Sequence, residues 1–202
     1  EDDGQIRRIM GEGINIILII TVPATIGILI LAQPMVRIFF QRGAFSQGAT
    51  HMTSQALIFY SIGLVGSSLR LMLNRVYYSF QDTKTPMING ALAVGLNVVL
   101  NLLLIKPMGH SGLALATSIS ATFTTLLLFV DLRKKLGRMG LKRYLICFVK
   151  ALIASVIMGV VVYFTYFGLM SLLPNKWIID LLILLLSVAV GLFLYIILCS
   201  VL

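Results

Sequence analysis

Residues 151–175, ALIASVIMGVVVYFTYFGLMSLLPN, run for 25 positions without a charged side chain. An α-helix needs about 20 apolar residues to cross the hydrocarbon of a bilayer, so this stretch is long enough to span a membrane. Five further charge-free runs of 21 to 27 residues lie along the chain, at 13–36, 43–69, 85–105, 107–130 and 181–202. The sequence therefore predicts an all-α, polytopic integral membrane helical bundle with six transmembrane helices.

The composition excludes most other classes of protein. Of the 202 residues 59% are hydrophobic and 11% charged, which is too apolar for a soluble globule of this size. The net charge of +9 is compatible with nucleic-acid binding, but its distribution indicates membrane topology. If Glu1 is cytoplasmic, eleven of the sixteen basic residues are inside and four are outside, as the positive-inside rule requires. We predict cytoplasmic ends and no nucleic-acid partner, with RKKLGRMGLKR at 133–143 near anionic phospholipid headgroups.

The polar segments between the runs set the expected helix boundaries. We predict helices over about 14–39, 54–78, 86–106, a fourth ending near 132, 144–170 and 177–202. Pro23 and Pro34 should kink the first helix without breaking it, because neighbouring helices can satisfy the freed carbonyls. The loop at 106–111 is so short that the helices on either side must form a hairpin. The last two helices are the most uniformly apolar, so we divide the chain into a four-helix functional part, 1–136, and a lipid-facing pair, 137–202.

Arg70 is the one charged residue well inside a predicted span, and Ser67 and Asn74 lie above and below it at helical spacing. An intramembrane arginine is costly, by about 2.5 to 3.5 kcal/mol at the centre of a helix. Two interpretations stay open at this stage. Arg70 either snorkels to the cytoplasmic interface, or faces a cavity and, with Ser67 and Asn74, binds an anionic substrate.

Asparagines recur on one face of the third helix, at positions 89, 97 and 101. The fourth helix carries a small residue at every fourth position, and this ladder predicts close helix packing: Gly112, Ala116, Ser120 and Thr124. Thr117 follows Ala116 on the adjacent face of the helix. Side-chain oxygens of Asn97, Asn101 and Thr117 would suit a hard cation such as sodium. Hydrogen bonds between the two helices are the alternative.

The remaining polar and sulfur-containing residues have simpler predicted roles. Asp82, Thr83 and Lys84 form a capping turn, whereas His51, His110 and Asp180 are expected near the outer surface, isolated and solvated. Cys147 and Cys199 are expected to be small buried apolar residues. No span carries a paired acid and base, a nucleophile with a base, or a metal-ligand cluster, so an enzyme is not predicted.

Several stretches, in order and spacing, resemble the MurJ (MviN-like) lipid II flippases of the MOP superfamily of exporters. They are PATIGILILAQPMVRIFFQRGAF from Pro23, RVYYSFQDTKTP from Arg75, NVVLNLLL from Asn97 and SGLALATSIS from Ser111. Members of this family have fourteen transmembrane helices, and the six here resemble helices nine to fourteen. The resemblance implies that an N-terminal lobe belonging to the same protein is missing from this chain.

The resemblance also implies an activity, a partner and ligands. The family exports lipid II, the undecaprenyl-pyrophosphate-linked peptidoglycan precursor, across the bacterial cytoplasmic membrane by alternating access, without a catalysed reaction. Its terminal helix pair shapes a groove for the lipid tail, which corresponds to 137–202. Some members bind sodium at positions matching Asn97, Asn101, the carbonyl of Leu113 and Thr117; Asn101 stands where an acidic ligand is expected. No other cofactor is implied.

Two rival functions fit the hydropathy as well. One is an exporter of another lipid-linked oligosaccharide or of a drug, from the same superfamily. The other is a membrane scaffold that transports nothing. The combination of RGAF at 42–45 with FQDTKTP at 80–86 favours the flippase over the other exporters.

Overall fold

The computed structural model describes residues 2–41, 45–137, 141–173 and 177–201. These residues form seven α-helices: α1 (Asp2–Phe40), α2 (Gln47–Ile62), α3 (Leu64–Ser79), α4 (Lys84–Met108), α5 (His110–Leu136), α6 (Leu141–Leu172) and α7 (Trp177–Val201). Five of them are long and apolar enough to cross a membrane, and α2 with α3, a pair bent by 46°, meets the same criteria as a sixth candidate span. The predicted all-α bundle of six spans is confirmed.

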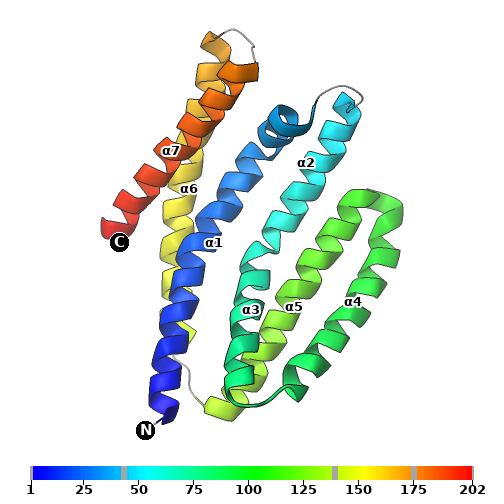
Figure 1. Cartoon of the computed structure of the whole chain (residues 1–202), viewed down its shortest axis with the longest axis vertical. Coiled ribbons are helices and arrows are strands. Elements are labelled where there is room, and N and C mark those ends of the chain that lie inside the picture. The colour runs from blue at the N-terminus through cyan, green and yellow to red at the C-terminus, as the bar shows by residue number, and fades with distance from the viewer. Residues whose placement is uncertain (1, 42–44, 138–140, 174–176, 202) are drawn as a thin grey trace.

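Helix α1 is the central element of the bundle. It packs against α2 and α3 on one side and against α6 and α7 on the other, while α5 lies against α2, α3 and α4 (Figure 1). Helix α4 is the outermost on its side and packs mainly on α5, to which Gly109 alone connects it. The predicted hairpin at 106–111 is therefore confirmed, and the positive φ of Gly109, 56°, is the backbone conformation that the tight turn requires.

Two separate hydrophobic clusters hold this arrangement together, and α1 contributes to both. The first joins one end of α1 to α3 and α5; its buried members are Met10, Ile14, Leu18, Leu69, Leu73, Tyr77, Leu128, Leu132 and Leu136. The second joins the other half of α1 to α6 and α7; its buried members are Leu31, Ile38, Ala154, Met158, Val162, Tyr166, Ile183, Leu184 and Tyr195. The α6–α7 hairpin thus attaches to the remaining helices through α1.

The two prolines of α1 lie inside a continuous helix, as predicted. Pro23 has no N–H, so the carbonyl four residues before it, that of Ile19, lacks its helical partner. The hydroxyl of Tyr195 on α7 donates a hydrogen bond to this Ile19 carbonyl at 2.8 Å. A neighbouring helix therefore satisfies the group that Pro23 leaves unpaired, which is how proline is accommodated at membrane depth.

The prediction of one continuous helix over 54–78 is wrong, because the helix is interrupted at Gly63 and divides into α2 and α3. A Cβ at Gly63 would lie 2.6 Å from Cα of Ser118, and one at Gly66 would lie 3.0 Å from Cα of Thr122. Both glycines let the backbone of this span approach α5 more closely than any other residue would allow. The close approach and the bend occur at the same place.

Hydroxyl groups of flanking helices donate hydrogen bonds to backbone carbonyls at the bend and beside it. Ser118 of α5 donates to the Phe59 carbonyl at 2.6 Å, and Thr125 of α5 donates to the Gly66 carbonyl at 2.7 Å. From the other side, Thr25 of α1 donates to the Ser61 carbonyl at 3.3 Å. Since hydrocarbon offers no substitute partner, these three bonds make the bend a fixed feature of the bundle.

Two helix ends also differ from the prediction. Helix α2 begins at Gln47, seven residues before the expected Ser54, because the Ser46 side chain accepts a hydrogen bond from the Ala49 N–H and caps the helix there. Helix α1 begins at Asp2 instead of about residue 14. Its extra turns are amphipathic, with Met10 and Ile14 buried in the first cluster.

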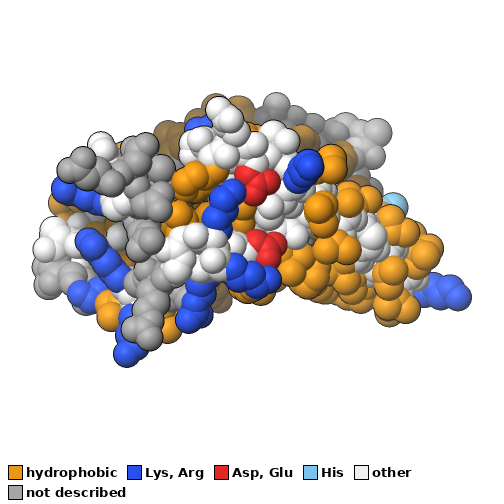
Figure 2. All heavy atoms as spheres, turned by 90° about the horizontal axis from the view of Figure 1, so that it is seen from below, with side chains coloured by type: hydrophobic (Ala, Val, Ile, Leu, Met, Phe, Trp, Pro, Cys, Tyr) orange, Lys and Arg blue, Asp and Glu red, His pale blue; other side chains and the backbone are white. Residues whose placement is uncertain are grey.

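The end of the bundle that carries the N-terminus of α1 is rich in charge. Viewed from that end, Lys and Arg side chains gather over much of the surface, with acidic side chains between them (Figure 2). In the turn before α4, Asp82 accepts hydrogen bonds from the Thr85 N–H at 3.1 Å and from Lys135 Nζ at 3.0 Å. The predicted capping turn is therefore confirmed, and Asp82 also ties it to the end of α5.

These contacts predict a pH-dependent stability. The Thr85 N–H, and after it the Lys135 ammonium, lower the pKa of Asp82 to about 2, against about 3.9 in an unfolded chain. A lowered pKa stabilises the folded state above about pH 4, and the effect is lost as the pH falls toward 2. We expect Asp82→Asn to flatten the fall in thermal midpoint between pH 4 and 2. Parallel curves for the two proteins would contradict this.

Candidate functional site

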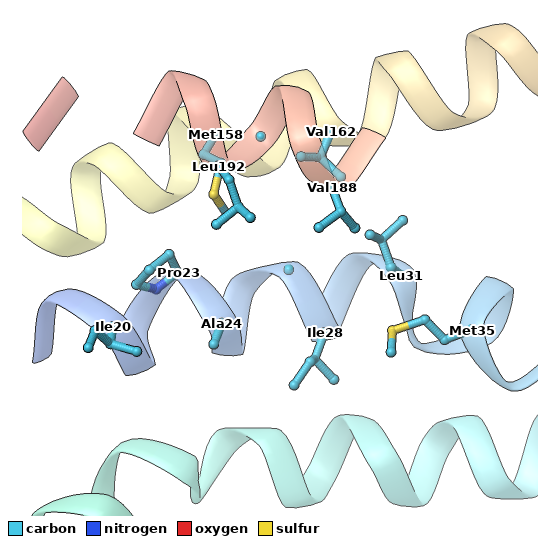
Figure 3. A pocket seen from close by; sticks show the side chains of 12 residues that line it. Ile20, Pro23, Ala24, Ile28, Leu31, Met35, Met158, Val162, Val188 and Leu192 are labelled. Carbon is cyan, nitrogen blue, oxygen red and sulfur yellow. The ribbon is translucent and has the colours of Figure 1, made fainter. Parts of the chain in front are cut away.

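An apolar groove lies between the central helix and the last two helices. It has a volume of about 360 Å³, and its lining comes from α1, α6 and α7: Ile20, Pro23, Ala24, Gly27, Ile28, Leu31, Met35, Met158, Val162, Val188, Gly191 and Leu192. Leu31 of α1 points toward Val188 of α7 across the groove (Figure 3). None of the lining side chains carries a charge or a hydrogen-bonding group, so the groove suits a hydrocarbon ligand.

Small residues at the helix contacts shape the groove. Gly191 of α7 packs so closely on α6 that a Cβ there would clash with Val162. Gly27 of α1 is different, because a Cβ at this position would meet no heavy atom within 4 Å. The helices therefore touch beside the groove and leave it open at Gly27.

Polar contacts between α1 and α7 flank the groove at both ends. At one end Tyr195 donates to the Ile19 carbonyl. At the other, Arg37 pairs with Asp180 at 3.2 Å, and Trp177 Nε1 donates to the Ile38 carbonyl at 2.9 Å. The prediction that Asp180 is isolated and solvated is wrong: the residue is buried and ion-paired, because the start of α7 packs on the end of α1.

The substrate-binding candidates Arg70, Ser67 and Asn74 all lie half-buried on α3. Among the described residues, the Nε atom of Arg70 is buried and has no hydrogen-bond partner. No side-chain hydrogen bond in the described part of the chain joins the three residues to one another. The three residues therefore lie near one another because they occupy successive turns of α3, and no hydrogen bond between their described side chains connects them.

The four sodium candidates fall into two pairs, one on each helix of the α4–α5 hairpin. On α4 the Asn101 amide donates to Asn97 Oδ1 at 2.9 Å, and on α5 the Thr117 hydroxyl donates to the Leu113 carbonyl at 2.9 Å. Asn101 Oδ1 is buried and has no partner within the described residues. An unpartnered buried oxygen fits a cation ligand, and Asn97 Oδ1 keeps a second lone pair beside the bond from Asn101, whereas the Leu113 carbonyl already accepts the Thr117 hydroxyl in addition to its helical N–H.

The small-residue ladder of α5 packs closely, as predicted. A Cβ at Gly112 would lie 2.5 Å from the Leu104 carbonyl oxygen of α4, and Ala116, Ser120 and Thr124 are buried. The third asparagine of the stripe, Asn89, donates to Asp131 at 3.0 Å across the two helices. Asp131 received no role from the sequence, although it follows Thr124 by seven residues, or two helical turns, and therefore continues the face of the ladder.

The remaining predicted residues have mixed outcomes. His110 is exposed, as expected, whereas His51 contacts Gln55 at 3.0 Å and is not isolated. Cys147 is half-buried, and Cys199 is exposed, so the prediction that both are buried is wrong. Both face a pocket between the helix ends at the N-terminal end of α1.

The sequence matches a known protein family over most of its length. A family model described as lipid II flippase MurJ matches residues 1–188. The chain belongs to the MurJ lipid II flippase family.

Individual relatives agree with this assignment. The probable lipid II flippase MurJ of Haemophilus influenzae is 38% identical over 78% of this chain and 31% of its own length. That of Thermotoga maritima is 31% identical over 80% of this chain and 33% of its own length. The match thus spans between about a quarter and a third of the length of the curated MurJ relatives.

A solved structure extends the comparison to nearly every residue. The structure titled lipid II flippase MurJ, inward closed conformation, superposes with a TM-score of 0.81 and 26% sequence identity. It covers 99% of this chain, which corresponds to 40% of the solved one. The α1–α6–α7 groove therefore belongs to a multi-pass membrane protein of the MurJ family.

Proposed function

We propose that the chain forms part of a lipid II flippase that moves the undecaprenyl-pyrophosphate-linked precursor from the cytoplasmic to the outer leaflet. The observation that carries this proposal is the superposition of 99% of the chain on a MurJ structure. The rest of the transporter, including an N-terminal lobe against which these helices rock, lies outside the 202 residues. In this proposal the activity is transport by alternating access, with no bond made or broken.

The orientation follows from the charges. We place the end with the N-terminus of α1, the 80–83 turn and the end of α5 in the cytoplasm, since most basic residues lie there. The ends of α1 and α6 and the start of α7 are then outside. Trp177 at the start of α7 is consistent with an interface position, because its ring is half exposed while its N–H is hydrogen-bonded.

The groove between α1, α6 and α7 would hold the lipid tail. A polyprenyl chain carries no hydrogen-bonding group, and the groove offers it an apolar lining. The polar contacts at the two ends keep α7 on α1 while the groove between them stays open. The terminal pair 137–202 thus acts together with α1, which supplies seven of the twelve lining residues.

Transport by the full-length protein tests the proposal directly. Purified protein in liposomes should move labelled lipid II between leaflets, and its depletion in cells should stop wall synthesis while lipid II accumulates inside. A scaffold would move no lipid II. An exporter of another lipid-linked oligosaccharide would move that molecule and leave lipid II in place.

Arg70 is proposed to meet an anionic group of the substrate. Its buried, unpartnered Nε in a membrane span leaves charge uncompensated within the described residues. We expect Arg70→Ala to lower lipid II flipping at least tenfold with normal membrane insertion, and Arg70→Lys to retain part of the activity. Lys106→Ala, which removes an exposed cation, is the control. Full activity of Arg70→Ala would show that the side chain only snorkels.

Sodium is the second proposed ligand, held by Asn97, Asn101, Leu113 and Thr117. A ligand that binds only the folded state stabilises it, by about 1.4 kcal/mol at a concentration ten times the dissociation constant. The full-length protein should therefore melt at a higher temperature in sodium than in potassium at equal ionic strength. Asn101→Leu should abolish the difference. Equal midpoints of the unsubstituted protein in both salts would exclude the site.

A further inference from the structure

A second pocket, of a different character, lies at the end of the bundle that we place outside. It has a volume of about 480 Å³ and is lined by polar residues of two helices and of the segment after the first: Gln33 and Arg37 of α1, Gln41 just after α1, and Gln47, Thr50 and His51 of α2. Gln33 and Arg37 are four positions apart and therefore share one face of α1. This size is within the range of small-molecule sites, and the lining is amide-rich where the α1–α6–α7 groove is apolar.

Side chains around this amide pocket are held in place by networks on both sides. Arg37 is fixed by the ion pair with Asp180 of α7, whose side chain is 8% exposed. His51 contacts Gln55, which in turn accepts a hydrogen bond from Ser111 of α5 at 3.3 Å. Side chains that are oriented before a ligand arrives lose less conformational freedom when it binds.

The charge of the pocket decides which ligand it suits. Asp180 balances the Arg37 guanidinium, and the lining residues that the structure describes include no other Lys or Arg and no Asp or Glu. A phosphate or pyrophosphate group would thus find little net positive charge on these described residues. Glutamine amides each offer donors and an acceptor, which match sugar hydroxyls and an acetamido group in the same ligand.

We propose that the amide pocket binds an N-acetylated sugar on the outer side of the membrane. This inference rests on the proposed function, because it assigns the pocket to the saccharide portion of the exported headgroup after the lipid has crossed. Gln33 and Gln47 face the ligand from the two helices and bind its acetamido group and hydroxyls. The polyprenyl tail then occupies the apolar groove on the other face of α1.

Sugar binding to the full-length protein in nanodiscs tests this inference. The probe is di-N-acetylchitobiose, and cellobiose is its matched control, since it has the same linkage and lacks the acetamido groups. Saturation-transfer NMR should detect binding of the first and at least tenfold weaker binding of the second. Equal binding of both sugars, or no binding of either, would overturn the inference without requiring any variant.

Substitutions locate the bound sugar. Gln33→Leu with Gln47→Leu should weaken chitobiose binding at least tenfold, while Gln5→Leu, an exposed glutamine at the opposite end of α1, should leave it unchanged. Unaltered binding in a folded double variant, or displacement of the sugar by inorganic pyrophosphate, would contradict the proposed site. Lipid II flipping without sugar binding overturns this inference alone, whereas sugar binding without flipping overturns the flippase proposal alone.

Discussion

Gly27→Trp is expected to reduce lipid II flipping by the full-length protein at least tenfold while leaving it folded and inserted. A Cβ at Gly27 meets no heavy atom within 4 Å, so the backbone tolerates a side chain at this position. The indole would then occupy the groove between α1, α6 and α7, where Gly27 is part of the lining. If the tail binds there, the large apolar ring excludes it by occupying the same volume. Flipping is measured with labelled lipid II in liposomes.

A matched substitution separates blocked binding from a general effect of the bulky ring. Gly95 of α4 is also a helical glycine with nothing within 4 Å of its Cβ position, and it lies on the exposed face of the outermost helix. Gly95→Trp should therefore leave flipping close to the unsubstituted level. Normal flipping by Gly27→Trp, or equal losses in the two variants, would remove the groove from the mechanism.

Gly63→Ala is expected to destabilise the protein by about 1 to 3 kcal/mol, the usual range for an overpacked site. The added methyl group would lie 2.6 Å from Cα of Ser118, which is backbone and cannot rotate away. Moving α5 back to make room would lengthen the bond from the Ser118 hydroxyl to the Phe59 carbonyl. The measurement is unfolding of the full-length protein in detergent, followed by thermal midpoint or denaturant titration.

The same substitution at an open site is the control. Gly95→Ala should be neutral or stabilise the protein by up to about 1 kcal/mol, because alanine is the better helix former. If Gly63→Ala and Gly95→Ala proved equally stable, the bend at Gly63 would be a flexible hinge, and packing on α5 would not fix its angle.

The bend illustrates why part of the fold was not predictable. In the sequence, residues 43–69 form one charge-free run. Gly63 and Gly66 within it resemble any other small residues of a membrane helix. The break is stabilised by Ser118 and Thr125 of α5 and by Thr25 of α1, which lie far from it in the chain. Hydropathy reports the environment of a residue and carries no information on these partners.

The sequence likewise predicted the positions of some polar residues and not the environment of others. Helical spacing correctly placed Ser67, Arg70 and Asn74 on one helix, and the ladder from Gly112 correctly indicated close packing. The expectation for Asp180 failed because its partner, Arg37, is 143 positions away and meets it only when α7 lies on α1. Local pattern thus predicted which helix a side chain belongs to, and long-range packing decided whether it is solvated.

The sequence by itself determined that the chain crosses the membrane six times, because crossing hydrocarbon requires only length and apolarity, both local properties. It also contained the motifs by which the family can be identified. Only the tertiary structure decided that α1 is central, that an apolar groove and an amide pocket lie along it, and that Tyr195 completes the helix at Pro23. These features depend on which helix faces meet, and in a bilayer small residues and hydrogen bonds between helices select that pairing, because lipid is as apolar as the helices themselves.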